Sequence, residues 1–207
     1  MARLVFARWR EREIERGQLA RWQRVVADAS ALGFVPPTGL DTFLSVARDE
    51  PWGRVAIECH GALDAAGEAH LKPRLVQRGE AIPALEYFVL TASTEIELPK
   101  MSVLRRDRVW QPRGLARELG FAFARRYRVD TEGSRRADVV AALSPIAAQL
   151  VAAPIHLLRV DERRNRKTLE RTFTLSLAVE LYRMDDDFNL AAMLEIVRRF
   201  VTASQEH

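Results

Sequence analysis

The stretch 172–181 constrains the fold of this chain more than any other part of the sequence. Large apolar side chains occupy every second position of it: Phe173, Leu175, Leu177, Val179 and Leu181. Successive side chains of a β-strand point to opposite faces, so this alternation predicts a strand with one apolar and one mostly polar face. A strand of this kind packs one side against a core, which is typical of antiparallel sheets.

The same period of two recurs in other stretches of the chain. Predicted strands cover residues 55–60, 85–98, 102–110 and 155–160. The charged run 161–167 lies between two predicted strands and reads as a hairpin connection, which makes these strands antiparallel neighbours. Residues 61–67 read as a turn-rich connection that joins the first strands.

Helical periodicity recurs in four further segments of the chain. Predicted helices cover residues 7–32, 113–126, 134–151 and 188–203. Pro145 interrupts the third of these, because proline lacks an N–H donor and its ring clashes with the preceding turn. The order of elements lacks regular βαβ alternation, which favours an α+β fold. We therefore predict an antiparallel sheet of about four to five strands packed against helices, with long N-terminal and C-terminal helices.

Length and composition place the chain among globular proteins. It has 207 residues, of which 48% are hydrophobic and 29% charged. We expect one α+β domain over residues 1–207, with the N-terminal helical segment 1–50 as a candidate sub-lobe. Cys59 is the single cysteine, so an intramolecular disulfide cannot form, and its place on the apolar side of a predicted strand indicates a buried thiol. We expect a cytoplasmic protein without membrane insertion, since the sequence has no apolar run of roughly 20 residues.

The basic side chains are concentrated in one part of the sequence. The net charge is only +4, yet basic residues outnumber acidic ones in 100–136, whereas acidic residues dominate 49–97. Guanidinium groups neutralise phosphates or carboxylates, and interleaved aromatic rings can stack on bases. The alternative is that the arginines pair with the acidic region or line a solvated face. The candidate binding residues are Arg105, Arg106, Arg108, Arg113, Arg117, Arg125, Arg126, Arg128, Arg135 and Arg136.

A second candidate site combines a carboxylate with two imidazoles. Glu58 and His60 stand two apart on a predicted strand and share a face, and His70 follows closely in sequence. Such a set can bind a divalent metal ion, as a metal-dependent hydrolase or nuclease requires. The spacing matches no specific zinc signature, so solvent-facing polar residues on a half-exposed strand explain the same pattern.

The leading interpretation is a non-enzymatic binding or assembly protein without a cofactor. Its Arg-rich surface would contact an acidic partner, either another protein or a nucleic acid. The metal-dependent enzyme is one alternative. An oligomeric structural component is another, because the amphipathic helices 7–32 and 188–203 could form interfaces, with Trp9 and Trp22 as anchors.

Overall fold

The computed structural model describes the chain in several segments, most of them after residue 58. The described residues are 17–18, 20–35, 43–44, 55–56, 59–63, 67–76, 84–106, 114–165, 170–185 and 188–205. Among the residues singled out from the sequence, Trp9, Glu58, Arg108 and Arg113 lie outside these segments.

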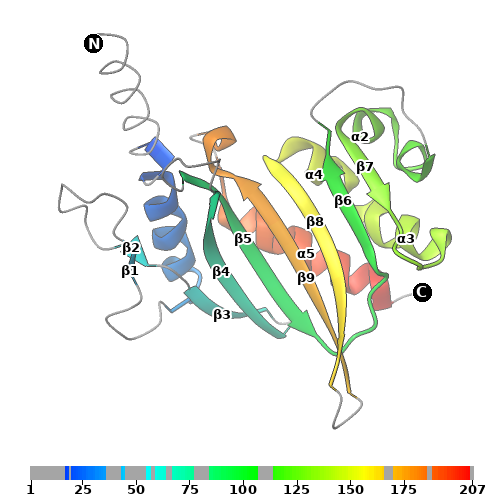
Figure 1. The fold of residues 1–207 in the computed structure, drawn as a ribbon, viewed down its shortest axis with the longest axis horizontal. Coiled ribbons are helices and arrows are strands. Elements are labelled where there is room, and N and C mark those ends of the chain that lie inside the picture. Colours follow the sequence, from blue (N-terminus) through cyan, green and yellow to red (C-terminus); the bar gives the residue numbers. More distant parts are fainter. Residues whose placement is uncertain are drawn as a thin grey trace.

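An antiparallel sheet forms the centre of the fold (Figure 1). Within the described residues it has seven strands, and every neighbouring pair is antiparallel. From edge to edge these are β3 (Cys59–Leu63), β4 (Gly67–Val76), β5 (Ala84–Thr94), β9 (Arg171–Glu180), β8 (Ile155–Arg164), β6 (Met101–Arg105) and β7 (Tyr127–Asp130). The strongly alternating stretch is thus the central strand β9. A separate short pair consists of β1 (Phe43–Leu44) and β2 (Val55–Ala56).

Helices pack on one face of this sheet. Figure 1 shows α5 running behind the central strands. The helical elements are residues 17–18 and 20–31, η2 (Gly114–Arg117), α2 (Phe121–Arg126), α3 (Arg136–Leu143), η3 (Ser144–Ile146), α4 (Ala147–Ala152), η4 (Leu181–Arg183) and α5 (Leu190–Gln205). None of the described helices combines the length and the apolar character that crossing a membrane requires.

The core lies between the helices and the apolar side of the sheet. In β9, Phe173 and Leu177 are buried, while the polar side chains between them, such as Ser176, are only half-buried. Leu177 pairs with Leu90 of β5, and fully buried Phe200 belongs to α5. Burying one such side chain stabilises the fold by about 1.5–3 kcal/mol relative to its exposure. The alternation that predicted β9 is therefore confirmed, and so is the burial of the Cys59 thiol.

Proline and glycine set the helix boundaries in the second half of the chain. The predicted helix 134–151 is split, as expected, where Pro145 forces the 3-10 turn η3 between α3 and α4. The predicted helix 113–126 was wrong as one continuous element. Gly120 has a φ of 99° and separates η2 from α2, because this left-handed region suits glycine and breaks a helix.

The fold prediction was wrong in its strand count and in its N-terminal helix. The sheet of the described residues has seven strands rather than four to five, because β4 and β7 were not predicted. The helix predicted over 7–32 covers residues 17–18 and 20–31 in the part of the chain that is described, so no long N-terminal helix is present there. The strand predicted over 55–60 is also wrong as one continuous element, since β2 and β3 belong to different sheets.

The missed strand β4 has only a weak apolar pattern on its inward-facing side. Its core-facing side chains include small Ala69, and Pro73 argues against a strand because it lacks an N–H donor. Within the described residues, the pairing of β3 with β4 ends at Leu71, so no described residue of β3 needs a donor from Pro73. The other missed strand, β7, has only four residues, too few for an alternating pattern to stand out.

A glycine on the edge strand β3 allows the N-terminal helix to approach the sheet. A Cβ atom at Gly61 would lie 2.7 Å from the ring of Phe34, which follows that helix and is buried. The neighbouring Val35 forms two backbone hydrogen bonds with His60 of β3. Farther back in the helix, Trp22 packs on Phe88 of β5 with ring centroids 6.0 Å apart.

Candidate functional site

Two arginines of the predicted basic surface serve the interior of the fold. The guanidinium group of Arg126 donates to the carbonyl oxygens of Val151 and Ala153, at the C-terminus of α4. It therefore caps carbonyls that have no partner within the helix. The side chain of Arg105 is only 12% exposed, and its Nη1 lies 3.5 Å from Oε2 of buried Glu180. Neither group is positioned to contact a partner molecule.

Three further arginines form ion pairs at the surface. Arg128 Nε lies 3.1 Å from Asp130, Arg135 Nε lies 2.9 Å from Asp138, and Arg136 pairs with Glu118. These acids come from the same part of the chain and not from the acidic region 49–97. Exposed pairs of this kind add little stability, but they reduce the positive potential that an acidic partner would meet.

The remaining described arginines lie in or next to the segment that carries an exposed aromatic ring. Phe121, the first residue of α2, is 68% exposed, and the guanidinium carbon of Arg125 lies 5.6 Å from its ring centroid. Arg117 lies in the preceding turn η2, and the backbone N–H of Arg106 donates to the carbonyl of Arg126 at the end of α2. We name Arg106, Arg117, Phe121 and Arg125 the α2 patch. None of its arginines forms an ion pair within the part of the chain that the structure describes.

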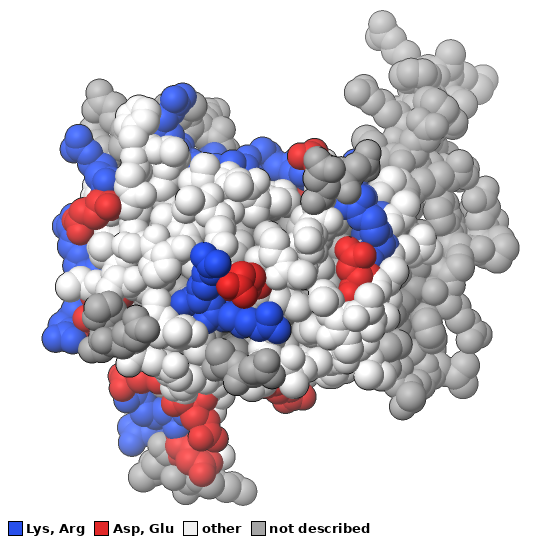
Figure 2. Space-filling model, turned by 180° about the vertical axis from the view of Figure 1, so that it is seen from behind, with Lys and Arg blue, Asp and Glu red and all other residues white. Residues whose placement is uncertain are grey.

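Basic side chains do not gather on the helix-covered side of the molecule. Figure 2 shows this face with Lys and Arg in small separate groups, several of them beside acidic side chains and most toward the rim. One pair on this side is Arg199 and Glu195 of α5, whose Nε and Oε1 atoms are 2.8 Å apart. Among the basic residues predicted from sequence, the α2 patch therefore remains as the candidate contact surface.

A polar cluster around Glu180 was not predicted from the sequence. Glu180 ends β9, and its side chain is 4% exposed. His156 Nδ1 lies 3.1 Å from Oε1, and the Tyr182 hydroxyl donates to the same oxygen at 2.9 Å. Arg183 Nε lies 2.6 Å from Oε2, the oxygen that Arg105 also approaches. The carboxylate thus joins β6, β8, β9 and η4, and its signal in sequence is only one acid at the end of an apolar strand.

Burial changes the pKa values of Arg105, within this cluster, and of Tyr127 beside it. Desolvation lowers the pKa of Arg105, and the nearby Arg126 and Arg183 guanidinium groups lower it further. Burial raises the pKa of Tyr127 to about 12. The Tyr127 hydroxyl lies 2.7 Å from the carbonyl oxygen of Leu150, to which it donates, and 3.1 Å from that of Ile155. The contacts of Tyr127 hold α4 against β7 and β8, and those of Glu180 join β6, β8, β9 and η4. We therefore interpret these buried polar groups as structural.

The predicted metal-ligating residues are partly brought together. His60 and His70 are direct cross-strand neighbours on β3 and β4. Glu58 lies outside the described residues, and Glu68 supplies a carboxylate in their vicinity, with Oε1 3.4 Å from His70 Nε2. Sequence reasoning missed Glu68 because it missed β4, on which Glu68 and His70 are two residues apart and share a face.

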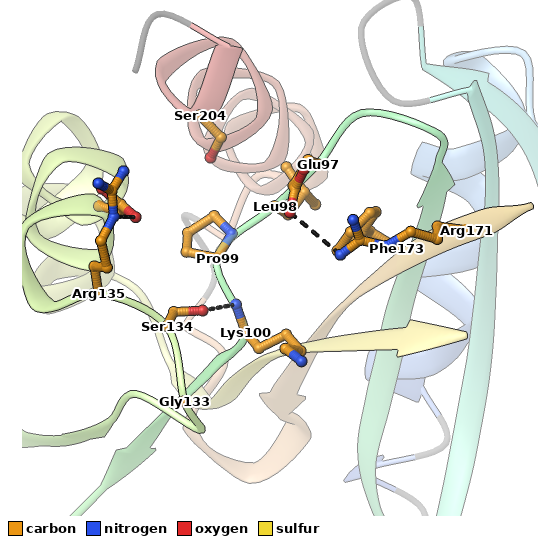
Figure 3. Close-up of a pocket in the computed structure, with 11 residues that line it drawn as sticks. Glu97, Leu98, Pro99, Lys100, Gly133, Ser134, Arg135, Arg171, Phe173 and Ser204 are labelled. Carbon is orange, nitrogen blue, oxygen red and sulfur yellow. Dashed lines mark hydrogen bonds and ion pairs between the residues drawn. The ribbon is translucent and has the colours of Figure 1, made fainter. Parts of the chain in front are cut away.

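A pocket of about 530 Å³ opens between the end of α5 and the loops that precede β6 and α3. Figure 3 shows Ser204 of α5 on one side and Lys100, Ser134 and Arg171 on the other. Lys100 donates its backbone N–H to the Ser134 hydroxyl oxygen at 2.7 Å. The charged groups at its rim are paired: Arg171 lies 3.2 Å from Glu97 and 2.6 Å from Glu162.

The same pairing shifts two pKa values at this rim. Hydrogen bonds from Arg171 and then from Lys100 lower the pKa of Glu162. The hydrogen bond with Glu162 raises the pKa of Arg171. Both groups are held in their charged forms and neutralise each other, so the rim offers a balanced polar surface and no concentrated charge.

Comparison of the chain with protein-family models, curated proteins and solved structures gives no match. The functional argument therefore depends on the geometry of the described residues.

Proposed function

We propose that this chain is a binding protein that recognises an acidic partner, a protein or a nucleic acid, through the α2 patch. The observation that carries the proposal is the 68% exposure of Phe121 beside Arg125, which has no acidic partner among the described residues, and the same is true of Arg106 and Arg117. An exposed aromatic ring costs free energy in water that binding recovers. Aromatic and arginine side chains are also the types enriched at interfaces.

The electrostatics of the patch support an acidic partner. Each arginine in an ion pair has its charge compensated locally, whereas Arg106, Arg117 and Arg125 keep theirs available to an approaching group. The planar guanidinium group binds carboxylate and phosphate through two parallel hydrogen bonds. Phe121 adds a flat apolar surface for a base or an apolar side chain.

A salt titration with matched variants tests the proposal. The triple variant Arg106→Gln, Arg117→Gln and Arg125→Gln removes three positive charges from the α2 patch. The control variant Arg74→Gln, Arg163→Gln and Arg164→Gln removes the same charge from β4 and β8. Fluorescence anisotropy would be recorded with labelled duplex DNA, single-stranded RNA and polyglutamate.

For duplex DNA, each lost phosphate contact reduces the steepness of log K against log salt concentration by about 0.9. The slope measured for the triple variant should therefore be shallower than that of the wild type by about 2.7. The control variant is expected to keep the wild-type slope. Equal slopes and affinities for the two variants would contradict the proposal that the α2 patch binds the acidic partner.

A substitution of Phe121 separates the two classes of partner. Phe121→Ala is expected to weaken the binding of single-stranded RNA by about 1–3 kcal/mol if a base stacks on the ring. Binding of polyglutamate, which offers carboxylates alone, would change little. Absence of binding to all three probes at low salt would contradict the proposal, since the electrostatic attraction is strongest there.

A further inference from the structure

His60 and His70 face each other across the edge of the sheet. They occupy the same register position on β3 and β4, and their rings are 4.5 Å apart with an angle of 74° between the planes. The backbone N–H and C=O of His60 bond to Val35, which lies on the side away from β4. The two histidines therefore form a non-hydrogen-bonded pair, the arrangement in which cross-strand side chains come closest.

Glu68 completes the group from the same face of β4. It precedes His70 by two residues, and its cross-strand partner is Ala62. The small alanine leaves room for the carboxylate to turn toward the imidazoles, and Glu68 Oε1 lies 3.4 Å from His70 Nε2. One ligand atom from each of His60, Glu68 and His70 lies within 4.8 Å of the other two.

We propose that His60, Glu68 and His70 bind a divalent transition-metal ion of the zinc class. Metal–ligand bonds of about 2.0–2.2 Å place the donor atoms of a tetrahedral site roughly 3.4 Å apart. Side-chain rotation that brings the donor atoms closer by at most about 1.4 Å suffices, and the backbone register already aligns the two imidazoles. Two histidines and one carboxylate suit zinc, copper or nickel better than calcium or magnesium, which prefer oxygen ligands.

The position of the group on the sheet determines the kind of site. The side chain of His70 is 23% exposed and that of Glu68 69% exposed, so the ion can enter from solvent. Three protein ligands leave at least one coordination position for water or for an anionic group of another molecule. Within the described residues, this is the group of His, Cys, Asp and Glu side chains that meets the geometry of a metal site.

Zinc titration of chelator-treated full-length protein tests the inference. Isothermal calorimetry is expected to show one saturable site in the wild type. Glu68→Gln should lower the affinity for zinc at least about tenfold. Replacing a group that only hydrogen-bonds to a metal ligand already lowers metal affinity by about that factor. The double variant His60→Gln and His70→Gln should lose the site, while the control Glu195→Gln on α5 should keep it. Glu68 is mostly exposed, so Glu68→Gln keeps the fold and remains informative if the double variant does not.

Cobalt provides a second readout of the same ligands. Co²⁺ in the wild type is expected to give d–d absorption that disappears in the histidine variant. Absence of a saturable one-to-one site in the wild type would overturn the inference. Equal zinc affinity of the wild type, Glu68→Gln and the histidine variant would place the metal elsewhere, for example at His207, and would overturn it as well. None of these measurements involves the acidic partner, so their outcome is independent of the function proposed above.

Discussion

Removal of the Glu180 carboxylate is the sharpest test of the structural cluster. Glu180→Ala leaves Arg105, whose side chain is 12% exposed, without its buried counter-charge. Breaking one partner of a buried ion pair costs about 3–5 kcal/mol. Arg183 is 42% exposed and can turn to water, so it adds little to this cost. The expected loss in the free energy of unfolding is therefore about 3–5 kcal/mol.

Urea denaturation followed by circular dichroism measures this loss directly. For a chain of this length it corresponds to a decrease of about 6–20 °C in Tm. Glu195→Ala is the matched control, since it removes an exposed partner of Arg199 and should cost no more than about 0.5 kcal/mol. Replacing both charges, as Arg105→Met with Glu180→Leu, should recover more than half of the loss, because the uncompensated charge is then absent. A loss below about 1 kcal/mol for Glu180→Ala would refute the interpretation of a buried, stabilising carboxylate.

Two further changes test the packing around the sheet. Tyr127→Phe should cost about 1–3 kcal/mol in urea denaturation at neutral pH, because the Leu150 and Ile155 carbonyl oxygens lose their donor. The fold raises the Tyr127 pKa to about 12, so its contribution is complete below about pH 10 and is lost as the pH rises through about 12. The wild type should lose about 2–3 kcal/mol over that range that Tyr127→Phe does not lose, and parallel pH profiles would contradict this. Gly61→Ala should lower the free energy of unfolding by about 1–3 kcal/mol, because the new methyl group overlaps the buried Phe34 ring, and an unchanged Tm would contradict this contact.

The elements that the sequence predicted well are those whose pattern is local and strong. The alternation in β9 and the apolar stripe of α5 repeat over many residues, so a single face of each must be buried. Pro145 was sufficient to locate the break between α3 and α4, because its effect depends only on its own backbone. The elements that were missed have short or mixed patterns. In β4, Ala69 and Pro73 weaken the apolar signal, and β7 has only four residues.

The candidate sites show the same division. The residue types of the metal group were found in part, since His60 and His70 were selected from sequence, but Glu68 required the pairing of β3 with β4. The arginines were all selected from the sequence, but the different structural roles of Arg105 and Arg126 were not predicted. Arg126 caps a helix that begins about twenty residues later, and Arg105 meets a carboxylate on a strand near the end of the chain.

Local composition determined which segments could extend, coil or turn, because backbone preference and the period of apolar side chains act over a few neighbouring residues. It also determined that one face of the central strands would be apolar. Only the tertiary structure decided which arginines stay available at the surface, because the pairing of a charge depends on side chains brought close by folding from distant positions. The exposed ring of Phe121 and the paired imidazoles of His60 and His70 arise in the same way, from strand register and helix packing that the sequence does not display locally.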